Sequence, residues 1–388
     1  MYAIKTYNKI SHVGLELFDK SKYEISDGAE APVGAIVRSA ALHEENFPSS
    51  LIAIARAGAG TNNIPVNRCS EEGIVVFNTP GANANAVKEL VIAGLLLSSR
   101  KIVPAIEWAK TLKGNGDAVG KMVEKGKSAF GGPEISGKKL GVIGLGAIGV
   151  LVANAAYRLG MDVYGYDPYL SLNNAWELSH NVHHAADMKE IFEKCDYITF
   201  HIPLTPETKN TVNAKTLASM KDGVRILNFA RDGLVNSADM IAALESGKVA
   251  SYVVDFPTDE MIGVDGVVCI PHLGASTPES EDNCAVMAAK QLIDFIENGN
   301  ITNSVNLPNV SLARDAAMRI CVIHRNIPNM LTSVTSVLAN DNVNIENMLN
   351  RSKGDFAYTV LDVNECDKES VAAHISAVDG IINVRIIG

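Results

Sequence analysis

Short apolar segments alternate with polar or glycine-containing turns over the first eighty residues. They read AIKTYN, YEIS, GAIVRS, LIAIARAG and VVFNT, and stretches of helical periodicity fit between them. This pattern predicts an α/β domain with a parallel sheet. From residue 85 to residue 110 the pattern becomes one long helix, apolar on nearly every face, which is typical of a helix buried on several sides. Pro104 is expected to kink or restart it.

A second α/β series begins at residue 139, after a polar, glycine-rich stretch. Its segments read KKLGVIGLG, MDVYGYD, CDYITFHIP, GVRILNFAR, SYVVDFP and GVVCIPH, and a helix over residues 277–298 closes it. From Met318 onward the pattern predicts strand, helix, two strands, helix and strand. That order is the β-α-β-β-α-β arrangement of ferredoxin-like modules.

The composition excludes several classes of protein. With 388 residues, 47% of them hydrophobic and 20% charged, the chain can bury large cores and is not intrinsically disordered. A formal charge of −10 offers no basic footprint, so no nucleic-acid partner is expected. The apolar run from Leu90 to Leu97 is far shorter than the ~18 residues of a membrane span, so no membrane partner is expected. The N-terminus has no apolar signal segment, and six widely spaced cysteines without a CxxC pair indicate reduced thiols in a cytoplasm.

A glycine-rich turn between a predicted strand and helix indicates a dinucleotide site. Gly144, Gly146 and Gly149 form G-x-G-x-x-G, and Asp167 ends the next strand. The glycines allow a tight turn, close approach of a pyrophosphate and close helix–strand packing. A carboxylate at Asp167 would accept hydrogen bonds from ribose hydroxyls and repel a 2′-phosphate, so the expected cofactor is NAD. No metal site is expected, because the His183–His184 pair lacks further ligands at suitable spacing.

Polar groups also follow three consecutive late strands of this series. Arg231 follows RILNFA, Asp255 and Glu260 follow SYVV, and His272 follows VVCIP. Because ligands bind outside the carboxyl ends of parallel strands, these groups should face one site. An imidazole, a carboxylate and a guanidinium in one site suit the oxidation of a 2-hydroxy acid, which requires a base and a cation that holds the substrate carboxylate. In this interpretation His272 is the base, Glu260 its partner and Arg231 the cation. The alternative interpretations are that His272 is a structural or surface histidine and that Asp259 and Glu260 form a solvated acidic turn.

The blocks LGVIGLGAIG, YDP, HIPLTPET, NFARDGLV and PHLGAST resemble the D-isomer-specific 2-hydroxyacid dehydrogenases. The resemblance covers nearly the whole chain. It implies an α/β fold with a Rossmann-type nucleotide-binding domain inserted in a flavodoxin-like substrate domain. The implied substrate domain comprises residues 1–100 and 285–305, and the NAD-binding domain residues 101–284. A linker, residues 306–317, would precede a ferredoxin-like module at residues 318–388.

The resemblance also implies roles for individual residues. The catalytic trio falls on Arg231, Glu260 and His272. The implied cofactor contacts are Gly144, Gly146, Ala147, Ile148, Gly149, Asp167, Pro203, Thr208, Ala230, Asp255 and Gly274. The implied substrate contacts are Arg38, Ser39, Gly58, Ala59, Gly60 and Asn83, with Arg38 as the candidate for a phosphate group.

Three features depart from the family pattern. Asp232 follows Arg231 where the family has glycine, which adds an acid beside the substrate anchor. The segment VVDFPTDE leaves two candidates for the carboxylate partner of His272, of which the Asp-to-Glu spacing favours Glu260 over Asp259. Residues 113–135 replace the family's tryptophan-containing segment, so substrate contacts from that region are open.

Within the family, the blocks IVRSA, RAGAGTNNI and FNTPGANANAVKEL resemble enzymes that oxidise 3-phospho-D-glycerate to 3-phosphohydroxypyruvate in L-serine biosynthesis. Alternatives are a glyoxylate, hydroxypyruvate or D-lactate dehydrogenase, or an NAD-sensing protein without catalysis. The last 70 residues resemble an ACT domain, which implies L-serine as an effector at His324, Asn326 and Asn344. A module that only joins subunits is the alternative. Asn329 replaces the turn glycine and tolerates positive φ. A homodimer or homotetramer is implied.

Overall fold

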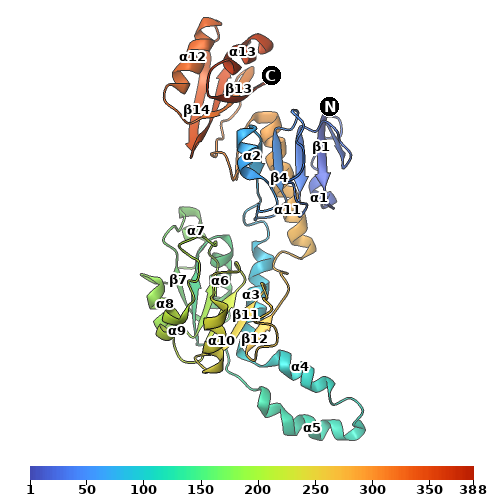
Figure 1. Cartoon of the computed structure of the whole chain (residues 1–388), viewed down its shortest axis with the longest axis vertical. Helices are drawn as coiled ribbons and strands as arrows, with labels where there is room; N and C mark the ends of the chain where they lie inside the picture. The colour runs from blue at the N-terminus through green and yellow to red at the C-terminus, as the bar shows by residue number, and fades with distance from the viewer. The chain divides into compact units, whose positions relative to one another are not determined.

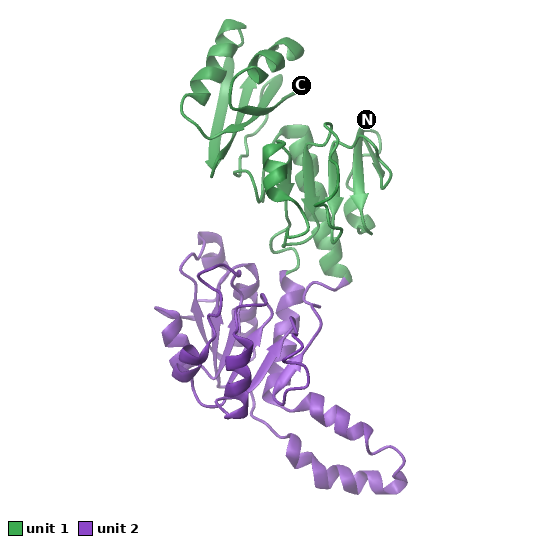
Figure 2. Ribbon diagram, in the orientation of Figure 1, with its two compact units in different colours: residues 1–83, 278–388 green, residues 84–277 purple.

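A computed structural model describes all 388 residues, which form two compact units. Residues 1–83 and 278–388 form the first unit and residues 84–277 the second (Figure 2). The division therefore lies after residues 83 and 277 instead of the expected 100 and 284. The reason is α3 (Ala84–Ser99), whose buried side chains Val87, Val91 and Leu95 belong to a core of the second unit.

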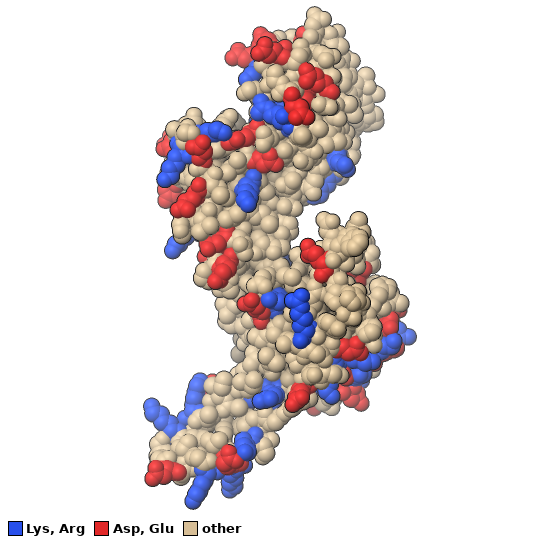
Figure 3. Space-filling model, turned by 180° about the vertical axis from the view of Figure 1, so that it is seen from behind, with Lys and Arg blue, Asp and Glu red and all other residues tan.

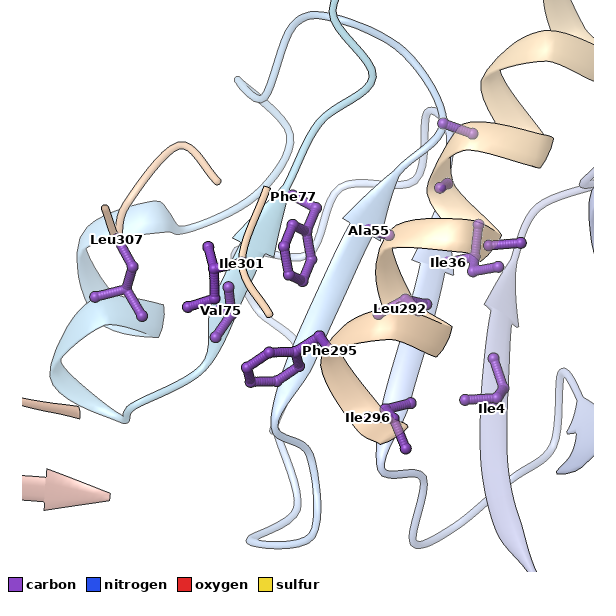
Figure 4. Close-up of a cluster of buried hydrophobic side chains, with 14 of the residues drawn as sticks. Ile4, Ile36, Ala55, Val75, Phe77, Leu292, Phe295, Ile296, Ile301 and Leu307 are labelled. Atoms are coloured by element: carbon purple, nitrogen blue, oxygen red, sulfur yellow. The ribbon is translucent and has the colours of Figure 1, made fainter. Parts of the chain in front are cut away.

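The first unit contains a five-stranded parallel sheet in the order β2-β1-β3-β4-β5. Its strands are β1 (Tyr2–Tyr7), β2 (Tyr23–Ser26), β3 (Gly34–Val37), β4 (Ala53–Arg56) and β5 (Val75–Phe77). The helices are α1 (His12–Leu15), α2 (Val66–Glu71) and α11 (Pro278–Asn298). Figure 4 shows α11 lying on the sheet, with Leu292, Phe295 and Ile296 facing apolar strand residues. This helix therefore completes a core whose strands come from the start of the chain.

The second unit has a seven-stranded parallel sheet in the order β12-β11-β10-β9-β6-β7-β8 (Figure 1). Its strands are β6 (Lys139–Ile143), β7 (Asp162–Tyr166), β8 (His183–His184), β9 (Tyr197–Phe200), β10 (Val224–Asn228), β11 (Val249–Val254) and β12 (Val267–Cys269). The order of the strands reverses between β6 and β9. Ligands of open α/β sheets bind at such a switch point, at the carboxyl ends of the strands.

Helices cover both faces of this sheet. One core contains residues of α3 and α6 (Ala147–Arg158), and the other contains residues of α8 (Met188–Lys194), α9 (Ala214–Ser219) and α10 (Ser237–Glu245). The short helix α7 (Leu172–Glu177) follows β7. These layers confirm the predicted α/β class, and burial on both faces explains why the strands are apolar almost throughout.

The predicted long helix over residues 85–110 is two helices. α3 ends at Ser99 and α4 (Ile102–Lys110) begins three residues later, so that Pro104 lies in the first turn of α4. A proline is tolerated there, because the first N–H groups of a helix have no intrahelical partner. The helix therefore restarts before Pro104 instead of bending at it.

Residues 102–130 form an arm made of α4, the 3-10 turns η1 (Gly116–Ala118) and η2 (Lys127–Phe130), and α5 (Val119–Gly126) (Figure 1). The rings of Trp108 and Phe130 pack against each other with their centroids 5.2 Å apart, and this contact joins the two sides of the arm. Ile102, Val103 and Ile106 are exposed on α4. Basic side chains gather over the arm in the view of Figure 3. The arm thus combines exposed apolar and charged side chains.

The C-terminal module has the predicted β-α-β-β-α-β order. Its elements are β13 (Met318–Arg325), α12 (Met330–Asn340), β14 (Ile345–Lys353), β15 (Phe356–Val363), α13 (Lys368–Ser376) and β16 (Ile381–Ile387). They form an antiparallel sheet in the order β14-β15-β13-β16. One face packs on residues of α12 and α13, and the other joins the core that contains Phe295 and Ile301. The module is therefore packed on the rest of the first unit.

A buried ion pair anchors this packing. Arg319 on β13 and Asp362 on β15 are both 0% exposed and form two hydrogen bonds of 2.6 and 2.9 Å. The remaining guanidinium N–H groups donate to the backbone oxygens of Asn298, Leu312 and Ala313, each at 2.8 Å. All five donors of the guanidinium are thus used, and they connect the sheet to the end of α11 and the segment after it.

None of the helices has the length and apolar character that crossing a bilayer requires.

Candidate functional site

The glycine turn after β6 has the geometry of a dinucleotide cradle. Gly144 has φ +93°, and a Cβ there would lie 2.6 Å from the carbonyl oxygen of His201. A Cβ on Gly149 would lie 1.8 Å from the carbonyl oxygen of Gly144. Both glycines are therefore required by the fold itself. Gly146, in contrast, has no atom within 4 Å of its Cβ position, which leaves room for a ligand to approach the backbone at the start of α6.

Ala147 and Ile148 form the first turn of α6, beside this opening. Asp167 lies directly after β7, where Oδ2 accepts the N–H of Leu145 and Oδ1 accepts the N–H of Tyr169, both at 2.8 Å. These bonds hold the carboxylate next to the glycine turn. Each oxygen keeps a lone pair for a further donor, so Asp167 can still accept ribose hydroxyls. The residues around the turn therefore fit an NAD molecule.

Replacing Asp167 with Ala should reduce the preference for NAD over NADP by at least about tenfold, because a carboxylate repels the 2′-phosphate of NADP. The measurement is the ratio of kcat/KM for the two cofactors, which cancels losses common to both. Asp162→Ala, at the other end of β7, is the control and should leave the ratio unchanged. An unchanged ratio in Asp167→Ala would remove this residue from cofactor selection.

The segment after β9 lies beside the same turn. Burial lowers the pKa of His201 to about 3, so this imidazole is neutral throughout the physiological range. Its Nε2 lies 3.1 Å from Thr199 Oγ1, and its buried Nδ1 has no hydrogen-bond partner. Thr208 Oγ1 donates to the carbonyl of Pro203 at 2.7 Å and braces the loop. His201 is thus suited to contact a ligand at the switch point and unsuited to exchange protons.

Arg231 lies at the carboxyl end of β10 in a turn that Asn228 organises. Asn228 is buried, its Oδ1 accepts the N–H of Ala230 at 3.2 Å, and its Nδ2 donates to the carbonyl of Arg231 at 2.9 Å. Arg231 is exposed, and its Nη1 donates to the carbonyl of Ala230 at 2.7 Å. Asp232 is also exposed and accepts the N–H of Gly233 at 2.8 Å. The additional acid thus stabilises its own turn.

Sequence reasoning did not identify Asn228. The signal that could have found it is an asparagine as the last residue of an apolar strand, two residues before the Ala-Arg pair. An amide at that position can accept from and donate to the following turn, as it does here. Asn228 therefore positions Arg231 by holding this turn.

Asp255 brings the end of β11 to the same edge of the sheet. It is 1% exposed, and its Oδ1 has no hydrogen-bond partner. Burial raises the pKa of Asp255 to about 6, and the guanidinium of Arg231 opposes part of that rise. A Cβ on Gly274 would lie 3.7 Å from Asp255 Oδ2, so the segment after β12 also reaches this point. A buried carboxylate oxygen without a donor is suited to a hydroxyl or amide of a bound nucleotide.

His272 lies three residues after β12, with its ring centroid 4.5 Å from that of Phe256. The histidine is exposed, as are Asp259 and Glu260 in the turn after β11. The structure therefore brings Arg231, Asp255 and Gly274 together and places His272, Asp259 and Glu260 in the segments that follow the same strands.

The raised pKa of Asp255 has a consequence for stability. In the unfolded chain this carboxyl titrates near 3.8, and in the folded protein near 6. The protonated carboxyl adds fully to the free energy of unfolding below pH 3.8. This part of the free energy is lost as the pH rises from 3.8 through 6, because the unfolded chain releases the proton first and the folded state must finally bury a charge. The free energy of unfolding of Asp255→Asn minus that of the natural protein should therefore increase by about 1 kcal/mol from pH 5 to pH 8. Chemical denaturation across this range measures the difference, and a difference that does not change with pH would contradict the prediction.

Three of the predicted substrate residues, Gly58, Ala59 and Gly60, lie in the turn after β4. Gly58 has φ +151°, and a Cβ there would lie 1.5 Å from Arg56 Nη1, so the guanidinium of Arg56 lies directly over the turn. Arg56 Nε donates to the carbonyl of Arg38 at 3.1 Å. Asn78 Nδ2 donates to the carbonyl of Ala59 at 2.7 Å. Gly60 follows in this turn, and Asn83 is the last residue before the boundary with the second unit.

Arg56 is a candidate that sequence reasoning missed, although an arginine that ends a strand directly before a glycine turn is a readable signal. Arg38, the predicted phosphate ligand, forms an ion pair of 2.7 Å with Glu281. Ser39 is exposed, and its N–H donates to Asn8 Oδ1 at 3.1 Å. Arg38 directly follows β3 and Arg56 ends the adjacent strand β4, but the arginine that lies over the glycine turn is Arg56.

The predicted effector residues are not brought together within one chain. His324 is buried, and its ring nitrogens lie 2.7 Å from Arg325 O and 2.9 Å from Thr359 Oγ1. Asn326 Nδ2 donates to the carbonyl of Gly354 at 3.0 Å, at the same end of the sheet. Asn344 lies at the other end, beside Asn364. A site that uses all three would need a second copy of the module. Asn329 has φ +68°, so the turn without glycine is preserved.

The comparisons with known proteins agree with this geometry. Residues 92–274 match the family described as D-isomer specific 2-hydroxyacid dehydrogenase, NAD binding domain. The D-3-phosphoglycerate dehydrogenase of Haemophilus influenzae is 33% identical over 349 residues, which are 87% of this chain and 81% of that protein. The protein of the same name from Escherichia coli K12 is 33% identical over 88% of this chain and 83% of its own length.

Among solved structures, the NAD⁺-bound 3-phosphoglycerate dehydrogenase of Entamoeba histolytica has a TM-score of 0.62 and 26% identity. It covers 79% of this chain and 98% of its own. On the strength of these matches and of the glycine turn with Asp167, the chain belongs to the D-isomer-specific 2-hydroxyacid dehydrogenase family, and its second unit contains the family's NAD-binding domain.

Proposed function

We propose that this protein oxidises 3-phospho-D-glycerate to 3-phosphohydroxypyruvate with NAD, which is the first step of L-serine biosynthesis. The observation that carries the proposal is the 33% identity to D-3-phosphoglycerate dehydrogenases over most of both chains. The residues at the carboxyl edge of the seven-stranded sheet support it, because they provide a base, a cation and a buried carboxylate in one region.

Bound NAD⁺ would supply the hydride acceptor. Gly146 and the start of α6 would hold its pyrophosphate, and Asp167 would accept hydrogen bonds from its ribose hydroxyls. Asp255 would accept a hydrogen bond from the nicotinamide or its ribose. Pro203, Thr208, Ala230 and Gly274 would line the rest of the site.

The chain's own residues would perform the proton chemistry. Arg231 would bind and orient the hydroxy acid through its planar guanidinium. A ring nitrogen of His272 would accept the proton of the substrate hydroxyl. Glu260 would stabilise the resulting imidazolium, with Asp259 as the alternative partner. A proton can then leave from His272 to solvent, because this residue is exposed.

The first unit would hold the rest of the substrate. Backbone N–H groups of Gly58, Ala59 and Gly60 would bind the carboxylate. Arg56 and Arg38 would supply positive charge for the phosphate, and the ion pair between Arg38 and Glu281 would have to open for Arg38 to contribute.

We further propose a homodimer that buries the exposed apolar residues of the arm, and a homotetramer through paired C-terminal modules. Paired modules would bring Asn326 of one chain near Asn344 of another and so create a site for L-serine as an inhibitor. The cytoplasm is the proposed location, because all six cysteines are free thiols.

The test is the initial rate of NADH oxidation by the full chain with 3-phosphohydroxypyruvate, with and without L-serine. Rapid turnover that serine suppresses supports both the substrate and the effector. Rapid turnover without suppression keeps the substrate and removes serine. Turnover with glyoxylate or pyruvate alone would overturn the proposed substrate.

A further inference from the structure

A cavity of about 320 Å³ lies between the C-terminal module and the segment that follows α11, and the proposed reaction does not use it. Both parts of the first unit contribute its polar wall. The polar residues are Asn78, Asn303, Ser304, Asn309, Ser352 and Lys353. No acidic residue lines the cavity, so the ammonium of Lys353 is the only formal charge on its wall. An anion is therefore the favoured kind of ligand.

The wall also retains hydrogen-bond donors. Lys353 Nζ donates to the carbonyls of Ser304 and Val305 at 3.1 and 3.0 Å, which leaves one of its three N–H groups. Asn78 uses one amide N–H on Ala59 O and keeps the other. The side-chain amides of Asn303 and Asn309 also line the pocket. One ammonium and several amide donors match the oxygens of a carboxylate or a phosphate.

We propose that this junction pocket binds a small metabolite through a carboxylate or phosphate group. The pocket is open to solvent at Asn309, Ser352 and Lys353, and its volume of about 320 Å³ can accept an acid of three or four carbons. The pocket shares no residue with the effector candidates His324, Asn326 and Asn344, so it is a second ligand site on the first unit.

The pocket is joined to the substrate turn through Asn78. This residue donates from Nδ2 to Ala59 O, and its own N–H donates to Asn303 O at 3.3 Å. The next residue, Thr79, donates its N–H to Gly58 O at 3.0 Å. A ligand that contacts Asn78 therefore acts on a residue that holds the turn, and its binding and substrate binding influence each other reciprocally. This coupling, unlike the pocket itself, rests on the proposed function of the turn.

Asn309→Asp tests the pocket, because Asn309 is exposed and the change adds a negative charge to the wall at nearly constant size. Asn347→Asp, exposed on β14 outside the cavity, is the matched control. The full-length proteins are titrated with inorganic phosphate and, separately, with L-malate. Calorimetry measures the affinity, and hydrogen exchange measures protection of residues 302–310 and 350–356. At least one probe should protect both segments in the natural protein and in Asn347→Asp, and bind Asn309→Asp about tenfold or more weakly.

Protection by phosphate alone or by malate alone identifies the group that the pocket accepts. Absence of protection with both probes, or equal binding to Asn309→Asp and Asn347→Asp, overturns the proposal. Neither readout requires turnover, so a failure of the proposed reaction remains distinguishable from a failure of this site. Where a probe binds, the KM for 3-phosphohydroxypyruvate should change in the natural protein and not in Asn309→Asp. An unchanged KM in both removes the coupling.

Discussion

His272→Ala should lower kcat by about 10²–10⁴-fold, which is the range that general acid–base catalysis contributes. NAD binding should persist, because the glycine turn and Asp167 follow other strands of the sheet and are held in place by contacts that do not involve His272. The fold should also persist, since His272 is exposed. Steady-state kinetics measures the loss, and quenching of protein fluorescence by NADH measures cofactor affinity in the same preparation.

His184→Ala is the matched control. His184 is also an exposed histidine of the second unit, but it lies on β8, at the opposite edge of the sheet from β12. Its replacement should leave kcat and NADH affinity unchanged. If His272→Ala retained turnover within tenfold of the natural protein, the proton acceptor would have to be another group. If it lost NADH binding as well, the role of His272 would be structural.

Arg319→Met should destabilise the C-terminal module by about 3–5 kcal/mol, because it leaves the fully buried carboxylate of Asp362 without a partner. The change also removes the donors that hold the backbone oxygens of Asn298, Leu312 and Ala313. Chemical denaturation followed by hydrogen exchange of the peptides around Arg319 measures the effect on this module separately from the second unit. Separate readouts are needed because a chain with several domains need not unfold in one step.

The double variant Arg319→Met/Asp362→Leu separates the two causes. Replacing both members of a buried ion pair with apolar residues removes the unpaired charge, so much of the stability should return. Recovery should stay incomplete, because the three backbone oxygens remain without the guanidinium. Arg351→Met, exposed on β14, is the control and should change stability by no more than about 0.5 kcal/mol. A single variant as stable as this control would show that the ion pair does not hold the module.

Local sequence predicted the features that depend on neighbouring residues. The spacing of Gly144, Gly146 and Gly149 before a helix, with Asp167 at the end of the next strand, identified the nucleotide turn because a turn is formed by consecutive residues. The rule that parallel strands present their carboxyl ends at one edge predicted that Arg231 and Asp255 would face one site. Burial raises the pKa of Asp255 and the guanidinium of Arg231 opposes part of that rise, so the two side chains lie near each other.

Contacts between distant segments were beyond this reasoning. Arg38 and Glu281 form an ion pair across the return of α11 to the first sheet, and nothing near Arg38 in the sequence signals it. The position of Arg56 over Gly58 depends on a backbone φ of +151° and on a side-chain direction that periodicity does not encode. His324 was predicted to contact the effector. Its ring is instead buried, and its nitrogens lie beside Arg325 O and Thr359 Oγ1, which local sequence does not indicate.

The sequence by itself determined the α/β class, the nucleotide turn with NAD as its cofactor, and the set of strands that carry the candidate catalytic groups. These depend on hydrophobic periodicity and on residues close together in the chain. Only the tertiary structure decided that α3 belongs to the second unit, that Arg319 fixes the C-terminal module to the end of α11, and that a polar pocket forms beside Asn78. Each of these depends on burial and on hydrogen bonds between segments far apart in sequence, and such pairs are selected when the whole chain packs.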